Sequence, residues 1–351
     1  MIGTLGNGVP GRLHQATHTT PDAITLQKMF ADYLQAGISA VAMEVSSHAL
    51  EQQRIEGVDI DVAVFTNISR DHLDYHASMQ SYGEAKQRLF RHPGVKCAVL
   101  NMDDPYGEVI AERLGDGVRP LRVGVDAADV ELRATQVEQT QQGLRMVLRY
   151  GAQQAKLESP LIGRFNVDNL LCVTGALLAA GVPLVQAVRR LSALAGAPGR
   201  MERFGGGRQP LVVVDYAHTP DALENALRAA RAHAAGELTC LFGCGGDRDS
   251  GKRPIMGGIA ERFADHVILT DDNPRSEPGD EIIAQILCGM QHPARVVRDR
   301  REAITLAIAQ ARPGDLVLVA GKGHEEQQVS GEQSVYFSDR EEVKRILEEL
   351  Q

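Results

Sequence analysis

The chain has 351 residues, enough for two domains of about 100–200 residues each, and its 43% hydrophobic and 24% charged content is ordinary for a globular protein. The net charge of −9 offers no basic stripe, which argues against nucleic acid as the main partner. Five cysteines without a Cys-x-x-Cys pair favour reduced thiols in the cytoplasm over a disulfide or zinc framework, and no apolar run approaches the ~18 residues of a membrane span.

Strand-like and helix-like segments alternate in the first half of the chain, a pattern that predicts a parallel sheet covered by helices. The helix at 24–36 ends at Gly37, a natural C-cap. Residues 118–161 break the alternation, and spaced apolar residues around Gln141-Gln142-Gly143 predict a β-hairpin there. The expected strands are 38–45, 60–65 and 95–100, and the expected helices are 24–36, 79–90, 166–181 and 183–194.

A glycine- and proline-rich segment at 195–207 is the best domain boundary, so we expect one domain at 1–197 and a second at 198–351. Five strands interleaved with helices predict a Rossmann-like, doubly wound second domain. The first domain is expected to open on a loop and a helix, without the strand and phosphate loop that usually begin such a sheet. The expected strands beyond the boundary are 211–215, 238–243, 266–270, 295–297 and 316–320, and a last helix is expected at 339–350.

Hydroxyl, amide, carboxylate and imidazole groups crowd into Thr66–His76, directly after an expected strand. Ligands of open α/β sheets gather at this end of the strands, and these groups suit a divalent cation that assists phosphate chemistry. The alternative is a helix N-terminus capped by Ser69 or Asp71, with solvated histidines. The residues alone leave both interpretations open.

The glycine-rich segment Gly246–Lys252 matches the spacing G-x4-G-K, but Arg253 stands where a phosphate loop has Ser or Thr. Its two aspartates would also repel phosphate oxygens. We therefore expect an electropositive turn in which Arg248, Lys252 and Arg253 are available to a carboxylate or a phosphate. A flexible glycine turn with surface charges is the alternative.

Two further polar clusters follow expected strands of the second domain. In Asp272-Asn273-Pro274-Arg275, the arginine fork can bind a carboxylate while the neighbouring Asp and Asn hold an ammonium group. Glu325, in Gly321–Glu325, can also bind an ammonium group. The alternative for the first cluster is an Asx-Pro turn with its arginine in solvent.

Asp215 and His218 also stand at a strand end, where they could contact a nucleotide. A helix cap by Thr219 or Asp221 can hold at the same time. Asn166 alone could be no more than the cap of its helix. Four strand-end polar clusters in one domain are hard to explain as caps alone, so their convergence on one face is the functional signal.

Taken in order, these motifs resemble the Mur ligase family over essentially the whole chain. The matching segments are Thr19–Pro21, Glu44–His48, Asp71–His76, Ala85-Lys86, Phe165-Asn166, Pro198–Glu202, Asp215–His218, Gly243–Arg248, Asp272–Arg275 and Gly321–Glu325. The resemblance implies an ATP- and Mg²⁺-dependent amide ligase of peptidoglycan precursor synthesis. It would join meso-2,6-diaminopimelate to UDP-N-acetylmuramoyl-L-alanyl-D-glutamate through an acyl phosphate, as a cytoplasmic monomer that binds small molecules and no membrane.

The resemblance also assigns roles to residues. Glu44, His72 and Lys86 resemble catalytic metal ligands, with Lys86 as a carbamate, although Lys86 by itself would be read as a surface lysine. The residues that resemble contacts to the UDP-muramoyl-dipeptide are Thr19, Thr20, Ser46, Gln52 and Arg54. Those that resemble ATP contacts are Asn166, Arg200 and Asp215. Those that resemble the amino-acid site are Arg248, Asp272, Asn273, Arg275, Gly321 and Glu325.

Arg275 gives the choice of amino acid a physical basis. Diaminopimelate carries a distal carboxylate that lysine lacks, so lysine would leave this arginine unpaired, at a cost of several kcal/mol.

Family members begin with a uridine-binding domain and a Gly-x-x-Gly-Lys-Thr/Ser loop, which this sequence lacks. We therefore expect a truncated first domain and little or no ligase activity from the 351-residue chain alone. The main alternative is a fragment that binds diaminopimelate or nucleotide without chemistry. A metal phosphohydrolase using Asp71–His76 would leave Arg275 and Glu325 unexplained.

Overall fold

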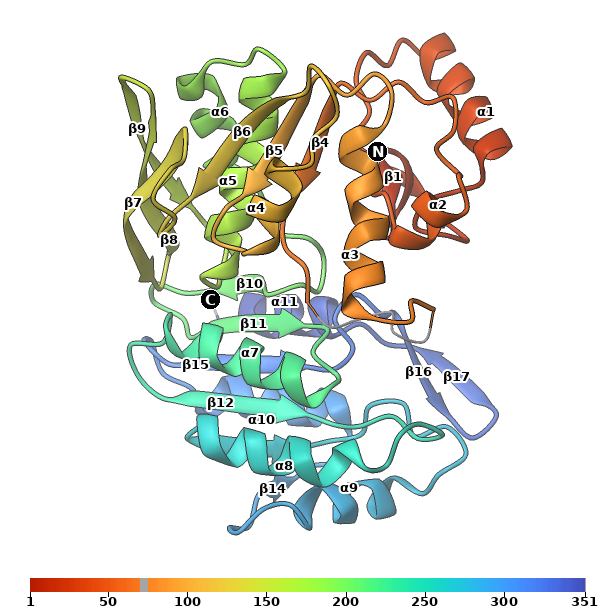
Figure 1. Ribbon diagram of the computed structural model, residues 1–351. Coiled ribbons are helices and arrows are strands. Elements are labelled where there is room, and N and C mark those ends of the chain that lie inside the picture. The colour runs from red at the N-terminus through yellow and green to blue at the C-terminus, as the bar shows by residue number, and fades with distance from the viewer. Residues whose placement is uncertain (70–74, 351) are drawn as a thin grey trace. The chain divides into compact units, whose positions relative to one another are not determined.

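The computed structural model describes residues 1–69 and 75–350, which form two compact units. The first unit holds residues 1–134, 149–153 and 168–187, and the second holds the remaining segments. The fold is α/β, as predicted, with parallel sheets and helices in both halves of the chain (Figure 1). Within the described residues, no helix is long and apolar enough to cross a bilayer.

In the first sheet β4 (Val62–Phe65), β5 (Cys97–Asn101) and β6 (Arg119–Gly124) run parallel, and β7 (Leu132–Thr140) also pairs parallel with β6. Every residue of β5 is buried, as expected for a strand covered on both faces. A Cβ at Gly175, on α5 (Phe165–Ala179), would lie 2.7 Å from Cγ1 of Val99, so the absence of a side chain allows this helix to approach β5 closely.

Three helices of the first unit, α1 (Ala23–Gln35), α2 (Ser47–Glu51) and α3 (Met79–Gln87), begin where a polar side chain accepts hydrogen bonds from free backbone amides. Asp22 accepts hydrogen bonds from the amides of Ile24 and Thr25 at the start of α1 (Ala23–Gln35), and Gly37, with φ +75°, follows its end as predicted. Ser78 and Ser81 form a reciprocal capping box at the start of α3 (Met79–Gln87), which confirms the expected helix with a 3₁₀ turn at Arg88–Arg91. Short helices α2 (Ser47–Glu51), α4 (Tyr106–Ala111) and α6 (Leu184–Leu191) complete the set.

The predicted strand at 38–45 is wrong. This segment contacts Ile2 through one isolated bridge at Met43, with hydrogen bonds from Ile2 N to Ala42 O and from Glu44 N to Ile2 O. A strand needs a ladder of such bonds, and an apolar run by itself does not provide a neighbouring strand. Most residues of 38–45 are accordingly exposed or half-buried rather than covered on two faces.

The expected opening on a loop and a helix is also incorrect, because a small antiparallel sheet precedes α1. It consists of β1 (Ile2–Gly3), β2 (Gly6–Val9) and β3 (Arg12–His14). These strands are short and glycine-rich, so they lack the alternation of apolar residues that reveals a strand in a sequence. The hairpin predicted within 118–161 is confirmed as β7 (Leu132–Thr140) and β8 (Gly143–Tyr150), and β9 (Gln153–Ser159) extends the sheet order to β4-β5-β6-β7-β8-β9.

All five strands predicted in the second half are present: β11 (Leu211–Asp215), β12 (Leu238–Phe242), β13 (His266–Leu269), β14 (Arg295–Val296) and β15 (Leu316–Ala320). They run parallel in the order β11-β15-β12-β13-β14, the doubly wound arrangement that was expected. An antiparallel strand, β10 (Glu202–Gly205), pairs with β11 at the edge of the sheet, within the segment predicted as the domain boundary. Each residue of Glu202–Gly205 pairs with a residue of β11, a partner that the local sequence of the segment does not reveal.

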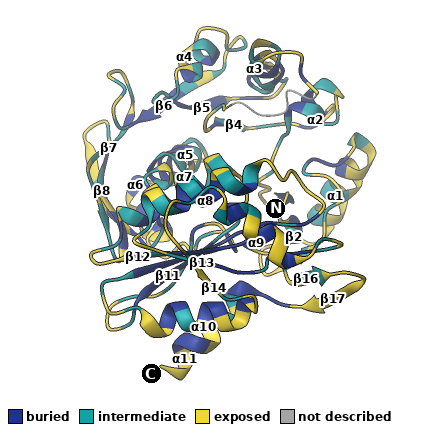
Figure 2. Cartoon of the chain, turned by 90° about the horizontal axis from the view of Figure 1, so that it is seen from below, coloured by how far each residue is buried: buried dark blue, intermediate teal, exposed yellow. Residues whose placement is uncertain are grey.

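Helices cover both faces of this sheet, and successive strand residues supply the two cores. Val213 packs with α7 (Pro220–Arg231), α8 (Lys252–Phe263) and α9 (Gly279–Leu287), whereas Val212 packs with α10 (Arg300–Gln310) and α11 (Asp339–Glu349). The central strands β11, β12 and β15 are therefore largely buried, and the outer faces of the helices are exposed (Figure 2). A hairpin that was not predicted, β16 (Gln327–Ser330) and β17 (Gln333–Tyr336), follows β15.

A buried histidine ties three segments of the second unit together. His233, 2% exposed, lies with Nδ1 2.6 Å from the carbonyl oxygen of Thr140 and accepts a hydrogen bond of 2.9 Å from Gly163 N at Nε2. The ring is therefore neutral, with its proton on Nδ1. Burial lowers the pKa of His233 from its usual value near 6.5, with Arg203 acting in the same direction and the bond to Thr140 opposing.

This lowered pKa predicts an acid-sensitive fold. Because the folded protein disfavours the charged ring, the stabilisation is fully present above about pH 6.5 and is lost as the pH falls through the lower folded-state pKa. We expect His233→Gln to lower the unfolding free energy at pH 8 by about 1–3 kcal/mol and to flatten its decline below about pH 6.5. Urea denaturation over this pH range measures both, with His14→Gln, at an exposed position, as the control. An unchanged pH profile in the His233 variant would contradict the assignment.

Candidate functional site

In the first unit, the residues expected to contact the UDP-sugar peptide form one hydrogen-bonded group. The Thr20 side chain is fully buried, and its hydroxyl donates to Glu44 O at 2.8 Å and accepts from Ser46 N at 3.1 Å. Arg54 Nη1 donates to Thr20 O at 2.9 Å, and its Nε and Nη2 both donate to Gln52 Oε1. The structure thus brings together residues that are 34 positions apart in sequence.

Glu44 is joined to the same group through its carboxylate. Its Oε2 accepts hydrogen bonds from Thr4 N at 3.3 Å and from Thr4 Oγ1 at 2.7 Å, and the hydroxyls of Thr4 and Thr19 lie 3.1 Å apart. A Cβ at position 3 would lie 2.7 Å from Glu44 Oε1, so Gly3 leaves room for this carboxylate. Sequence reasoning missed Thr4, which carries no motif that singles it out.

Lys86 lies in the last turn of α3, with Nζ 4.9 Å from the centre of the Tyr82 ring. His76 is buried near the same ring, with Nε2 2.9 Å from Ser47 Oγ and its ring centre 5.2 Å from that of Tyr82. This imidazole is held in the interior rather than solvated. His72 and Asp71 lie outside the described residues.

The residues of the first unit can be tested for their fit to Mg²⁺. Glu44 offers the carboxylate oxygen that this ion prefers, but an unmodified lysine ammonium is a donor only and cannot be a ligand. Among residues 1–69 and 75–350 there is no group of three or more His, Cys, Asp and Glu side chains placed to hold a metal. The unmodified side chains described here therefore do not by themselves form a magnesium site.

The three residues expected to contact ATP all belong to the second unit. Asp215, at the end of β11, accepts hydrogen bonds of 2.8 Å from Met201 N and from Ala217 N. Burial raises the pKa of Asp215, and these amides together with Arg200 oppose the shift. Arg200 lies over the Tyr216 ring at 4.8 Å, while Asn166 Nδ2 donates to Ile162 O at 2.7 Å. Thr219 caps α7, as anticipated, so the segment that follows β11 also starts a helix.

The turn after β12 differs from its predicted role. Arg253 is fully buried and donates to both carboxylate oxygens of Glu277 and to Gln285, so it is not available to a ligand. Lys252 Nζ donates to His218 O at 2.8 Å. Of the three cations expected there, Arg248 is the exposed one, and its Nη1 contacts only Asp247 O at 3.1 Å among the described residues.

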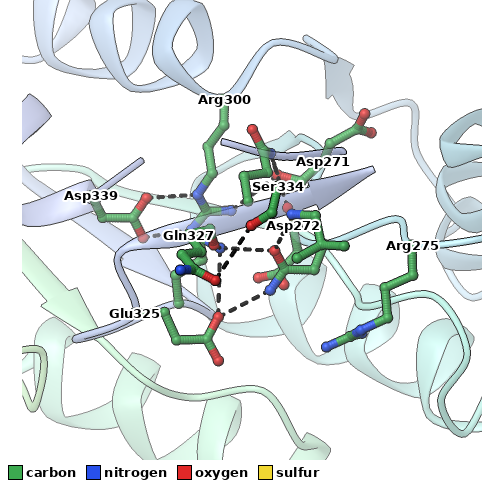
Figure 3. Close-up of polar contacts among 12 residues, drawn as sticks. Asp271, Asp272, Arg275, Arg300, Glu325, Gln327, Ser334 and Asp339 are labelled. Carbon is green, nitrogen blue, oxygen red and sulfur yellow. Dashed lines mark hydrogen bonds and ion pairs between the residues drawn. The ribbon is translucent and has the colours of Figure 1, made fainter. Parts of the chain in front are cut away.

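The carboxyl ends of β13 and β15 bring the expected amino-acid site together (Figure 3). Asn273 Nδ2 donates to Glu325 Oε2 at 3.0 Å, and its Oδ1 accepts from Val329 N at 3.0 Å. Gly321 has φ +116°, and a Cβ there would lie 2.6 Å from Asp272 Oδ2, which explains the glycine at this position. A donor amide and an acceptor carboxylate thus lie side by side.

Arg275 is fixed by its backbone as well as by its side chain. Its φ of +52° is unusual for a residue other than glycine, and β16 holds this conformation, with Arg275 N donating to Val329 O and Gly331 N donating to Arg275 O. Nη1 donates to Gly246 O at 2.8 Å. The guanidinium lies apart from the Arg300–Asp339 pair, as Figure 3 shows.

A buried ion pair that sequence reasoning missed supports these strand ends. Arg300 and Asp339 have fully buried side chains and form two hydrogen bonds of 2.7 and 2.8 Å, while Arg300 Nη2 donates to Ala320 O at 2.9 Å. Burial raises the pKa of Asp272, and the positive charges of Arg300 and Lys322 oppose the shift. Each of the paired residues lies in the first turn of a helix, where a charged residue signals nothing more than a helix start.

Each unit has a group of hydrogen-bonding side chains suited to a charged small molecule, around Thr20 in the first and around Asn273 in the second. Separate sites of this kind on α/β domains are typical of a ligase that joins two substrates. Comparison with known protein families supports this class. The Mur ligase middle domain matches residues 1–177, and the Mur ligase glutamate ligase domain matches residues 199–323. The chain belongs to the Mur ligase family.

Three individual relatives show which members of the family this chain is similar to. The UDP-N-acetylmuramoyl-L-alanyl-D-glutamate–2,6-diaminopimelate ligase of Ectopseudomonas mendocina is 49% identical over 350 residues, which cover 99% of this chain and 72% of that protein. A solved structure of a ligase with the same name is 40% identical, with a TM-score of 0.80 over 99% of this chain and 72% of its own. The MurF ligase of Thermotoga maritima in complex with ADP has a TM-score of 0.60 at 16% identity, covering 88% and 66%, a likeness of fold alone.

The Arg300–Asp339 pair generates a stability prediction. Removing one partner leaves the other charge buried, so we expect Arg300→Met or Asp339→Asn to lower the unfolding free energy by about 3–5 kcal/mol. Replacing both in Arg300→Met with Asp339→Leu removes both charges and should recover part of that loss. Urea denaturation of the three variants tests this, with exposed Arg301→Met as the control. A loss under about 1 kcal/mol in the single variants would show that the pair does not hold the strand ends.

Proposed function

We propose that the chain is the ATP-dependent ligase that adds meso-2,6-diaminopimelate to the D-glutamyl carboxylate of UDP-N-acetylmuramoyl-L-alanyl-D-glutamate. The names of its relatives support this assignment. The observation that carries it is the amide of Asn273 beside the carboxylate of Glu325, close in sequence to the fixed guanidinium of Arg275. Such a set matches a zwitterionic amino acid with an additional carboxylate.

In the amino-acid site, different residues would bind the positive and the negative groups of the ligand. Glu325 accepts hydrogen bonds from an ammonium group, and Asn273 Nδ2 donates to a carboxylate. Arg275 and Arg248 supply guanidinium groups for the carboxylate of the distal end, which lysine lacks. Asp272 and Gly321 shape the strand-end turn, the glycine because no side chain fits beside Asp272.

In the reaction, the γ-phosphoryl group of ATP passes to the D-glutamyl carboxylate, giving an acyl phosphate and ADP. The amine of diaminopimelate, having lost a proton, attacks the acyl carbon, and inorganic phosphate leaves as the amide forms. Mg²⁺, when bound, would stabilise the charge of the transferred phosphoryl group. We assign its ligation to Glu44, His72 and the carbamate of Lys86, since the lysine ammonium itself cannot bind the ion.

The remaining residues would bind and orient substrates. The group around Thr20 offers the UDP-muramoyl-dipeptide fixed hydroxyl, amide and guanidinium groups, from Thr19, Thr20, Ser46, Gln52 and Arg54. Asn166, Arg200 and Asp215 would contact ATP. We assign residues 1–197 to the domain for ATP and the muramoyl dipeptide and residues 198–351 to the amino-acid domain, in a cytoplasmic, monomeric enzyme.

Arg275→Ala tests the amino-acid site. We expect the Kd for meso-diaminopimelate, measured by calorimetry, to rise about tenfold or more, because a charge-assisted bidentate contact is lost. The Kd for ATP should not change. Arg295→Ala, at an exposed residue of β14, is the matched control and should bind diaminopimelate normally.

Two results separate the possible roles of the chain. Release of ADP that requires all three substrates demonstrates the ligase reaction, whereas diaminopimelate binding without ADP release leaves a binding module. If Arg275→Ala binds diaminopimelate as tightly as the unaltered chain, the proposed site is wrong.

A further inference from the structure

A fully buried lysine lies next to the amino-acid site and donates hydrogen bonds to it. Lys322, the second residue after β15, has a side chain with 0% exposure. Its Nζ donates to Asn273 Oδ1 at 3.2 Å and to Gln327 O at 2.6 Å, and it lies 3.5 Å from Glu325 Oε2. A buried lysine is rare unless its charge or its hydrogen bonds are used.

The partners of Asn273 determine which way its amide faces. Oδ1 accepts from Lys322 Nζ and from Val329 N, which occupy its two lone pairs. Turning the amide by 180° would place an NH₂ group against two donors and remove the bond from Nδ2 to Glu325. The alternative orientation is therefore strongly disfavoured.

We propose that Lys322 is a positioning residue that locks the Asn273 amide so that it presents only N–H to the ligand, and thereby selects a carboxylate at that point. This inference rests on the proposed amino-acid site. Among the described residues, Nδ2 has one acceptor, Glu325, so its second hydrogen remains available to the ligand. Without the lysine, the amide could turn and offer an oxygen, which would repel a carboxylate.

The same lysine also fixes the neighbouring carboxylate. Its charge attracts Glu325, which in turn accepts from Asn273, so donor and acceptor are held in one triangle of side chains. Burial lowers the pKa of Lys322, and the charges of Asp272 and Glu325 oppose the shift. Even a neutral amine keeps two donors, enough for Asn273 Oδ1 and Gln327 O. The orientation therefore does not depend on the charge of Lys322.

A double-mutant cycle on the full chain tests the inference with meso-diaminopimelate as the ligand. We expect Lys322→Met to raise the Kd by about 10- to 100-fold in the unaltered background and to have little further effect when Asn273 is already replaced by Ala. Lys344→Met, the same change at an exposed lysine, should leave the Kd unchanged. An equal loss of affinity in both backgrounds would show a merely structural role and would overturn the inference.

A second measurement needs no ligand. In protein labelled with ¹⁵N at the asparagine side chains, the Asn273 hydrogen that is bonded to Glu325 resonates away from the positions of exposed asparagine amides. Lys322→Met should move this resonance toward those positions, because an amide that turns loses the bond to Glu325. Unchanged resonances in that variant would overturn the inference. If diaminopimelate does not bind the unaltered chain while the resonances respond as expected, the proposed function fails and the positioning role of Lys322 stands.

Discussion

The amino-acid site depends on one buried cation that pairs the polar groups at the ends of two parallel strands. At the carboxyl ends of β13 and β15, strand carbonyls and the carboxylate of Asp272 lie in the protein interior, where an unpaired polar group is costly. Arg300 meets this need, because its guanidinium donates to Asp339 and to Ala320 O, and its charge opposes the rise in the pKa of Asp272. One buried cation thus joins α10, α11 and β15. The two loops that carry Asn273 and Glu325, which follow β13 and β15, begin beside this fixed point.

From that point outward, main-chain groups fix the site. Val329 N donates to Asn273, Val329 O accepts from Arg275 N, and Gln327 O accepts from Lys322. The hairpin of β16 and β17 therefore acts as a frame for side chains contributed by the two strand ends. Such a frame explains how Arg275 keeps a left-handed conformation, because hydrogen bonds on both sides of the residue offset the strain.

The sequence predicted the parallel strands of the second sheet closely, since a strand buried on both faces appears as an unbroken apolar run such as Leu316–Ala320. It failed where the local pattern carried no information about pairing. The apolar segment 38–45 lacks a ladder of partners, whereas the polar strands β16 and β17 form because a turn brings them together. Motif positions identified Asn273, Arg275 and Glu325 as a group, and the structure places Asn273 against Glu325. Arg253 shows the limit of this approach, because no local signal distinguishes a cation that faces a ligand from one buried against Glu277.

The residues that the sequence missed share one property: they act through other residues. Thr4 contacts Glu44, Lys322 contacts Asn273, and Arg300 contacts Asp339, each across dozens of positions in the chain. A residue that touches a ligand belongs to a recognisable chemical class, such as an arginine for a carboxylate. A residue that orients another residue can be of any type that pairs with its neighbour in the fold. The sequence does not reveal which residue that neighbour is. This is why the role of Lys322, which lies inside a recognised motif, becomes visible only from the hydrogen bond that its Nζ donates to Asn273 Oδ1.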